Sequence, residues 1–269
     1  MKMKCLLCRH SWDAPDPENA ADCPKCGYSA AFRKIDFLFA GSRKPVRIFK
    51  LEDAESTYEG ALMAGYPHGF GVMYLKSGIR YEGFFQNGEY HGFGKVTVEP
   101  QAGERTGEWF EGSYYRGSRH GRGEAHYRTG AVYQGDFYNN KEQGFGTLHT
   151  PEGTEYTGEF RDGKFHGSGT LRMANGDTYT GDFLCGQFCG YGKCLYSRGG
   201  SYTGSWRDGS WNGEGELVLP TGTRLKGTFR DGKMDGTFIV RRTDGTLGYG
   251  VWKNGEFCSG VRDHPEDDA

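Results

Sequence analysis

A fixed period of 23 residues constrains this chain more than any other feature of its sequence. The repeated phrase is clearest at residues 156–169, which read Tyr-Thr-Gly-Glu-Phe-Arg-Asp-Gly-Lys-Phe-His-Gly-Ser-Gly. Its leading residue occurs at Tyr58, Tyr81, Phe110, Tyr133, Tyr156, Tyr179, Tyr202 and, in the eighth repeat, Leu225. These residues lie 23 apart, except for a step of 29 between Tyr81 and Phe110. A regular period of this length is typical of an array in which each repeat packs on its neighbours.

Each repeat has the pattern of a β-hairpin, with positions counted from the leading residue. The third position is glycine and the fifth is apolar in all eight repeats, whereas the second and fourth are mostly polar. This alternation predicts a strand with one buried face. Asn-Gly or Asp-Gly at the seventh and eighth positions, as at residues 87–88 and 162–163, predicts a tight turn. A second strand follows, with glycine at the twelfth and fourteenth positions and an apolar residue at the sixteenth.

Stacking of these hairpins predicts the fold of most of the chain, because one hairpin alone is only marginally stable. We expect an all-β fold, an elongated single twisted antiparallel sheet over residues 58–260, with eight full repeats and a half repeat. Such an array has about 17 strands. The high glycine content, 46 of 269 residues, suits this sheet if the rings at the first and fifth positions lie over the glycines at the third, twelfth and fourteenth positions.

Two Cys-x-x-Cys pairs precede the array. Cys5 and Cys8 are followed, after 14 intervening residues, by Cys23 and Cys26. This spacing is typical of a tetrahedral zinc site with four thiolate ligands. Residues 1–30 are therefore predicted to form a zinc ribbon with one structural zinc ion; free thiols or a redox pair are the alternative. The ribbon would cap the array, dock a partner protein or contact nucleic acid.

Residues 31–57 are too apolar for a flexible linker. Phe37–Phe39 and Val46–Phe49 flank a turn-like break at residues 40–45. The pattern predicts a connecting hairpin that caps the first edge of the sheet.

The last repeats depart from the pattern. Leu225 replaces the leading aromatic residue, and Phe238 replaces the glycine of the fourteenth position. Terminal repeats with unusual residues are typical of a cap, or of a contact in a homodimer. Residues 261–269 are polar and are interpreted as a tail. Six extra residues within 99–106 of the second repeat predict a surface loop.

Other chemistry-bearing side chains follow the repeat. Histidine occupies the eleventh position at His68, His91, His120 and His166, and other residues take this place elsewhere. We interpret these histidines as hydrogen-bonding turn residues in preference to metal ligands. Three cysteines fall in the sixth repeat at Cys185, Cys189 and Cys194. Their positions, the seventh, eleventh and sixteenth, favour separate small residues over a second metal site.

The phrase Tyr-x-Gly-x-Phe/Trp-x-x-Gly-x-x-His-Gly-x-Gly resembles the MORN repeat (membrane occupation and recognition nexus) over about residues 58–257. The resemblance implies an aromatic-lined groove and a non-enzymatic scaffold, often dimeric, in cytoskeletal, flagellar or membrane-junction assemblies. Phospholipid binding has also been proposed for the family. A partner peptide or helix is expected in a groove lined by Tyr81, Phe85, Tyr133, Phe137, Tyr156, Phe160, Tyr179, Phe183, Tyr202 and Trp206.

Charge and motifs argue against several other classes of function. The formal net charge is −2, and residues 51–269 lack the cluster of basic residues that anionic membranes attract. Membrane binding and nucleic-acid contact through the ribbon are kept as alternatives to protein binding. Outside the repeat code no phosphate loop, nucleophile elbow or paired carboxylates occur, so neither catalysis nor a small-molecule substrate is expected. The absence of a long apolar run favours a cytoplasmic location.

Overall fold

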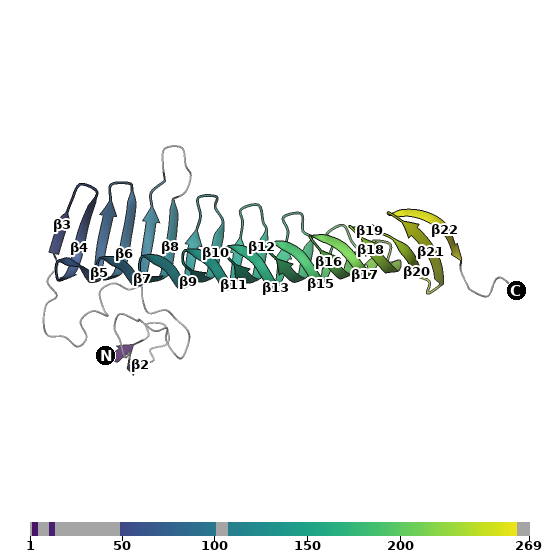
Figure 1. Ribbon diagram of the computed structural model, residues 1–269, viewed down its shortest axis with the longest axis horizontal. Coiled ribbons are helices and arrows are strands. Elements are labelled where there is room, and N and C mark those ends of the chain that lie inside the picture. The colour runs from purple at the N-terminus through teal and green to yellow at the C-terminus, as the bar shows by residue number, and fades with distance from the viewer. Residues whose placement is uncertain (1, 5–10, 14–48, 101–106, 263–269) are drawn as a thin grey trace. The chain divides into compact units, whose positions relative to one another are not determined.

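The computed structural model describes residues 2–4, 11–13, 49–100 and 107–262. Across these ranges the chain contains strands and turns and no helix, so the predicted all-β class is confirmed. Strands β1 (Lys2–Lys4) and β2 (Ser11–Asp13) form a small antiparallel pair. Strands β3 to β22 follow one another as a single open antiparallel sheet of 20 strands (Figure 1). No described helix has the length and apolar character that a membrane crossing requires.

The chain forms two compact units, residues 1–141 (unit 1) and residues 142–269 (unit 2). In unit 1 the strands of the large sheet are β3 (Phe49–Glu52), β4 (Ser56–Met63), β5 (Tyr66–Leu75), β6 (Ile79–Gln86), β7 (Glu89–Val98), β8 (Glu108–Tyr115), β9 (Ser118–His126) and β10 (Val132–Tyr138). Strand β3 pairs with β4, and each later strand pairs with the one before it. Of the predicted capping hairpin, residues 31–48 lie outside the described residues.

Unit 2 continues the same alternation. Its strands are β11 (Lys141–His149), β12 (Glu155–Arg161), β13 (Lys164–Arg172), β14 (Thr178–Leu184), β15 (Gln187–Leu195), β16 (Ser201–Arg207), β17 (Ser210–Val218), β18 (Arg224–Arg230), β19 (Lys233–Met234), β20 (Gly236–Arg241), β21 (Leu247–Lys253) and β22 (Glu256–Arg262). The first residue of β11, Lys141, belongs to unit 1. The sheet has more strands than expected because β3 precedes the first repeat and the return strand of the eighth is divided into β19 and β20. The half repeat also gains a return strand, β22, and becomes a full hairpin.

The turns form where the sequence predicts them. At the seventh position Asn87 and Asp162 both have φ of 51°, and the glycine after each also has positive φ. Two successive residues with positive φ are the signature of the type I′ turn, whose twist matches that of a β-hairpin. Cys185 takes this place in the sixth repeat with φ of 52°, so it is a turn residue.

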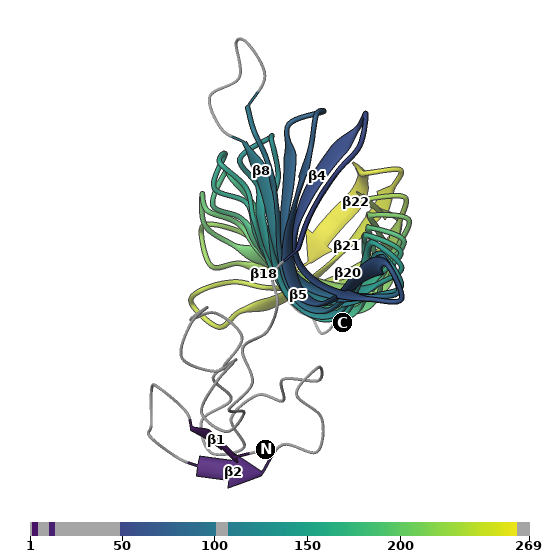
Figure 2. The same ribbon diagram turned by 90° about the vertical axis from the view of Figure 1, so that its left-hand side faces the viewer.

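A shift of register marks a bulge in the first, second, third, fifth, sixth and seventh hairpins. In the fifth repeat Gly158 lies opposite Gly169, but the next residue, Glu159, lies opposite His166. Gly167 and Ser168 are therefore extra residues on β13, and Gly167 has φ of 55°. A bulge bends its strand, and β5 in the first repeat is strongly curved along its length (Figure 2).

Candidate binding surface

The tyrosine of the first position is held by its own hairpin. The Tyr156 hydroxyl donates a hydrogen bond to the carbonyl oxygen of Glu159, at 2.9 Å, next to the bulge. The same bond to the fourth position, at 2.7–3.0 Å, is made by Tyr58, Tyr81, Tyr133, Tyr179 and Tyr202. Burial raises the pKa of Tyr156 to about 12, so the hydroxyl keeps the proton that it donates. The hydroxyl explains why tyrosine, and not only an aromatic ring, recurs at this position.

Two of the three glycine positions make room for this ring. A Cβ at Gly158 or Gly169 would lie 2.6 or 2.5 Å from the Tyr156 hydroxyl oxygen, so the prediction holds for the third and fourteenth positions. It is wrong for the twelfth. A Cβ at Gly167 would meet the Glu159 carboxylate instead, and this glycine is needed for the positive φ of the bulge.

The ten rings predicted to line a partner groove lie in the interior of the array. Their exposed fractions are between 0 and 7 % for Tyr81, Phe85, Tyr133, Phe137, Tyr156, Phe160, Tyr179, Phe183, Tyr202 and Trp206. Within unit 2, Tyr156 packs edge-on against Phe160 of its own repeat and Phe183 of the next, with centroids 5.0 and 5.1 Å apart. Rings of adjacent repeats therefore cover one another and form the core, which we call the ring column, and the exposed side chains of the array are other residues.

The tenth position completes the core, and the sequence did not single it out. Phe165 stacks on Tyr156 with centroids 3.8 Å apart, and Phe188 stacks on Tyr179 at 3.9 Å. In the third repeat Arg119 takes this place, and its guanidinium lies 5.4 Å from the centroid of Phe110. A cation over a ring face replaces the stacked ring there. Because the tenth position varies between aromatic and charged residues, its period is difficult to see in the sequence alone.

Exposed rings gather instead on the polar face of unit 1. His91 of β7, Tyr115 of β8, His120 of β9 and Tyr138 of β10 form what we call the tyrosine–histidine stripe. Successive ring centroids along it are 5.4, 5.7 and 4.9 Å apart. Tyr115 and Tyr138 are 48 % and 56 % exposed, whereas both histidines are half-buried. The guanidinium of Arg116 lies 5.4 Å from the Tyr115 centroid.

The stripe combines residues from two positions of the repeat. Tyrosine occupies the sixth position, beside the turn, in the third and fourth repeats, and histidine occupies the eleventh in the second and third. Because the eleventh position lies opposite the fourth in the hairpin, both kinds of ring project from the face that carries the polar residues. The Tyr115–His120 contact lies within one hairpin, whereas the contacts of His91 with Tyr115 and of His120 with Tyr138 join successive repeats, which the interpretation of these histidines as turn residues does not predict.

The side chains that could bind a metal ion are scattered over the described part of the chain. Among the described residues, no group of three or more His, Cys, Asp or Glu side chains is arranged to hold a metal ion. Cys185 is exposed, Cys189 is half-buried and Cys194 is buried. Burial raises the pKa of Cys189 and of Cys194, which favours the thiol over the reactive thiolate. The predicted zinc ligands Cys5, Cys8, Cys23 and Cys26 all lie outside the described residues.

Comparison with known proteins gives distant structural likenesses. No curated protein matches the chain. The TCP domain of SAS-4 (dCPAP) from Drosophila melanogaster, solved in complex with a proline-rich motif of Ana2 (dSTIL), is 13 % identical, with a TM-score of 0.36; the match covers 70 % of this chain and 96 % of that one. The wild-type TCP10 domain of Danio rerio CPAP is 15 % identical, with a TM-score of 0.37 and coverage of 67 % and 82 %. Scores this low do not carry a function from those domains to this chain.

A family model accounts for the repeats themselves. The model described as "MORN repeat" matches residues 58–80, 81–97, 110–132, 133–155, 156–178, 179–201, 202–224 and 226–237. Seven of these matches begin at the leading aromatic residues, and the eighth begins one residue after Leu225. The matches cover more than half of the chain, in the same hairpins that the structure shows. The chain therefore belongs to the MORN repeat family.

Proposed function

We propose that this protein is a non-enzymatic interaction scaffold and that the tyrosine–histidine stripe of unit 1 binds a partner protein. The observation that carries the proposal is the pair of exposed tyrosines, Tyr115 and Tyr138, each in ring contact with His120. The family implies a cytoskeletal, flagellar or membrane-junction setting for such a scaffold, and a cytoplasmic location is part of the proposal.

The stripe suits protein binding for two physical reasons. Tyrosine buries a large area with few rotatable bonds, and it is enriched among the residues that dominate binding energy at interfaces. The neighbouring histidine rings also restrict Tyr115 and Tyr138 before a partner arrives, so less conformational entropy is lost on binding. The buried rings of the core have no such role, because exposing them would remove the contacts between repeats.

Affinity capture from an extract of the cells that make the protein tests the proposal. The full chain is compared with the double variant Tyr115→Ser, Tyr138→Ser by quantitative mass spectrometry. Both side chains are exposed, so the variant should fold with an unchanged circular dichroism spectrum and melting temperature. We expect the partner to be depleted at least tenfold on the variant, because two central tyrosines at an interface commonly supply about 1–2 kcal/mol each.

A matched control comes from unit 2. Phe145 and Tyr191 are 61 % and 64 % exposed, and neither has a ring contact with another described aromatic residue. The double variant Phe145→Ser, Tyr191→Ser should retain the partner. Loss of the partner from this control and not from the stripe variant would refute the assignment of the stripe.

The alternatives give different results in direct assays. If the array were a membrane module, the full chain would float with vesicles that contain anionic lipid and would be released by salt. Nucleic-acid contact through the predicted ribbon would give a salt-dependent mobility shift that Cys23→Ser abolishes. The zinc prediction itself is checked by metal analysis of the full chain, which should contain about one zinc ion per molecule and lose it in the same variant.

A further inference from the structure

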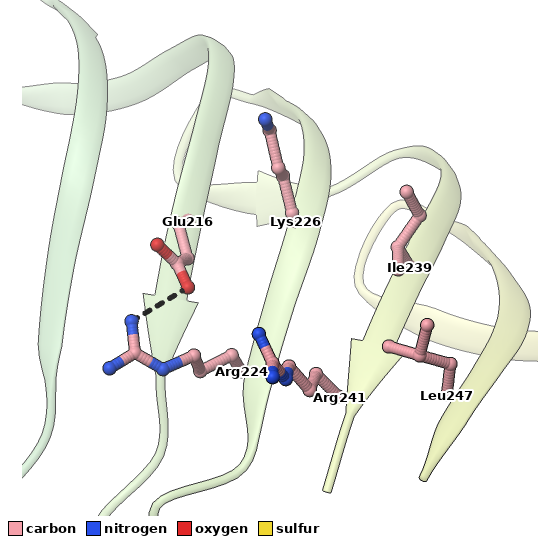
Figure 3. Close-up of a pocket in the computed structure, with 6 residues that line it drawn as sticks. All are labelled: Glu216, Arg224, Lys226, Ile239, Arg241 and Leu247. Carbon is pink, nitrogen blue, oxygen red and sulfur yellow. Dashed lines mark hydrogen bonds and ion pairs between the residues drawn. The ribbon is translucent and has the colours of Figure 1, made fainter. Parts of the chain in front are cut away.

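A second surface, on the last strands of unit 2, combines positive charge with exposed apolar side chains. A hollow of about 650 Å³ is lined by Glu216, Arg224, Lys226, Ile239, Arg241 and Leu247 (Figure 3). These residues come from β17, β18, β20 and β21, which are adjacent in the sheet. The five residues on β18, β20 and β21 face away from the buried ring column, because each neighbours a buried position in its strand.

The charges in this hollow are unbalanced. Arg224 donates to the Glu216 carboxylate at 3.1 Å, and within the described part of the chain neither Lys226 nor Arg241 has an ion-pair partner. Three cations thus face one carboxylate. Arg224 also lies directly opposite Arg241 in the β18–β20 register, and like charges in that relation destabilise a sheet. An anionic group bound between the two guanidinium groups would remove this repulsion.

The apolar side of the hollow continues along β21. Ile239, Leu247, Tyr249 and Val251 are exposed by 43, 48, 42 and 38 %. The cross-strand pairs Ile239–Tyr249 and Arg241–Leu247 place this apolar strip beside the cations. Four adjacent exposed apolar side chains on one strand pair are unusual for a solvated sheet face and are typical of an interaction surface.

We infer that this face binds an acidic polypeptide segment that also carries an apolar residue. Its carboxylates would lie between Arg224, Lys226 and Arg241, and its apolar side chain would lie against Leu247 and Tyr249. Strands β18 and β21 are two strand spacings apart, roughly 10 Å, and side chains on one face of an extended peptide repeat every ~6.6 Å. Acidic residues at alternate positions with an apolar residue two positions beyond span ~13 Å, which is long enough to reach from the cations of β18 to the apolar strip of β21. This site is separate from the tyrosine–histidine stripe and does not depend on it.

The test uses the full chain and a fluorescent Glu-Ser-Glu-Ser-Leu peptide, read by anisotropy. We expect saturable binding that weakens as salt is raised, because the contacts are ionic and exposed. The double variant Arg224→Gln, Arg241→Gln should weaken binding at least tenfold, and so should replacing both glutamates of the peptide by glutamine. Replacing the peptide leucine by serine should weaken it severalfold. The double variant Arg161→Gln, Arg172→Gln, which removes two exposed charges of unit 2 outside the hollow, should bind normally.

A second readout requires no ligand. Arg241→Gln removes the cross-strand repulsion, so the melting temperature of the free chain should rise by roughly 1–3 °C. Equal binding of the peptide by the wild-type chain and the Arg224→Gln, Arg241→Gln variant would overturn the proposal. So would binding of anionic vesicles that requires the same two arginines while the peptide does not bind, because the occupant would then be a membrane.

Discussion

At the residue scale, six of the eight repeats depend on one buried tyrosine hydroxyl. Tyr156 is fully buried, and its hydroxyl bonds to the carbonyl of Glu159 beside the bulge. A buried carbonyl that loses a hydrogen-bond donor costs free energy. The ring therefore packs neighbouring repeats together while its hydroxyl fixes the bend within one repeat.

The substitution Tyr156→Phe tests this role at constant ring packing. We expect the free energy of unfolding to fall by about 1–3 kcal/mol, because the Glu159 carbonyl loses its donor. Urea denaturation of the full chain measures the change. The exposed Tyr191→Phe is the control and should change the free energy by less than about 0.5 kcal/mol. Equal effects of the two substitutions would mean that the hydroxyl bond contributes nothing.

In the eighth hairpin, the buried aromatic ring comes from the second strand of the hairpin and not from the first. Leu225 replaces the leading tyrosine on β18, and Phe238 replaces the glycine of the fourteenth position on β20. Phe238 is fully buried and packs edge-on against Phe229, with centroids 5.0 Å apart. A Cβ at Gly227 would lie 2.6 Å from the Phe238 ring, so this ring occupies the place that tyrosine has in other repeats. The departure that had suggested a cap or dimer contact thus preserves core packing.

A double-mutant cycle tests this compensation. Phe238→Gly alone removes a buried ring and should cost about 3–5 kcal/mol. Leu225→Tyr alone adds a second ring to a filled space and should cost about 1–3 kcal/mol. The two together restore the usual repeat and should cost less than their sum, with a coupling of about 1–3 kcal/mol measured by denaturation. Additive costs would mean that the two residues pack independently.

Sequence patterns within one repeat predict the strands and turns, but they do not predict which side chains are exposed on the assembled array. Spacing within one repeat predicts the Asp-Gly turn at residues 162–163, the pairing of the hairpin and the glycines that make room for the Tyr156 ring. The groove assignment rested on the correct face of the strand, but period-two alternation does not say whether neighbouring repeats cover that face. Tyr115 and His120 meet across the turn of one hairpin, whereas His120 and Tyr138 meet through pairing between the third and fourth repeats, for which the sequence of one repeat carries no signal.

At the scale of the molecule, the buried tyrosines make stability dependent on high pH. Burial raises the pKa of Tyr58, Tyr156 and Tyr202 to about 12, whereas tyrosine in an unfolded chain ionises near pH 10. Below about pH 10 both states keep these protons. Between about pH 10 and 12 the unfolded chain loses protons that the folded chain keeps, so the free energy of unfolding must fall as pH rises.

Urea midpoints across this range measure the effect. We expect little change attributable to tyrosine below about pH 9.5 and a steep fall from about pH 10 to 12. The Tyr156→Phe variant should show a shallower fall, because it has one fewer buried tyrosine to ionise; the slope common to both chains belongs to the remaining tyrosines and to lysine. An identical slope in the two chains would contradict the pKa assigned to Tyr156.

Hydroxyl-radical footprinting can distinguish the tyrosine–histidine stripe from the ring column as the binding site, because it reports tyrosine exposure in the free chain and in the complex with the captured partner. We expect oxidation of Tyr115 and Tyr138 in the free chain, none of Tyr133 and Tyr156, and protection of Tyr115 and Tyr138 in the complex. Oxidation of Tyr133 and Tyr156 in the free chain, followed by their protection when the partner binds, would contradict it and would return the binding site to the ring column.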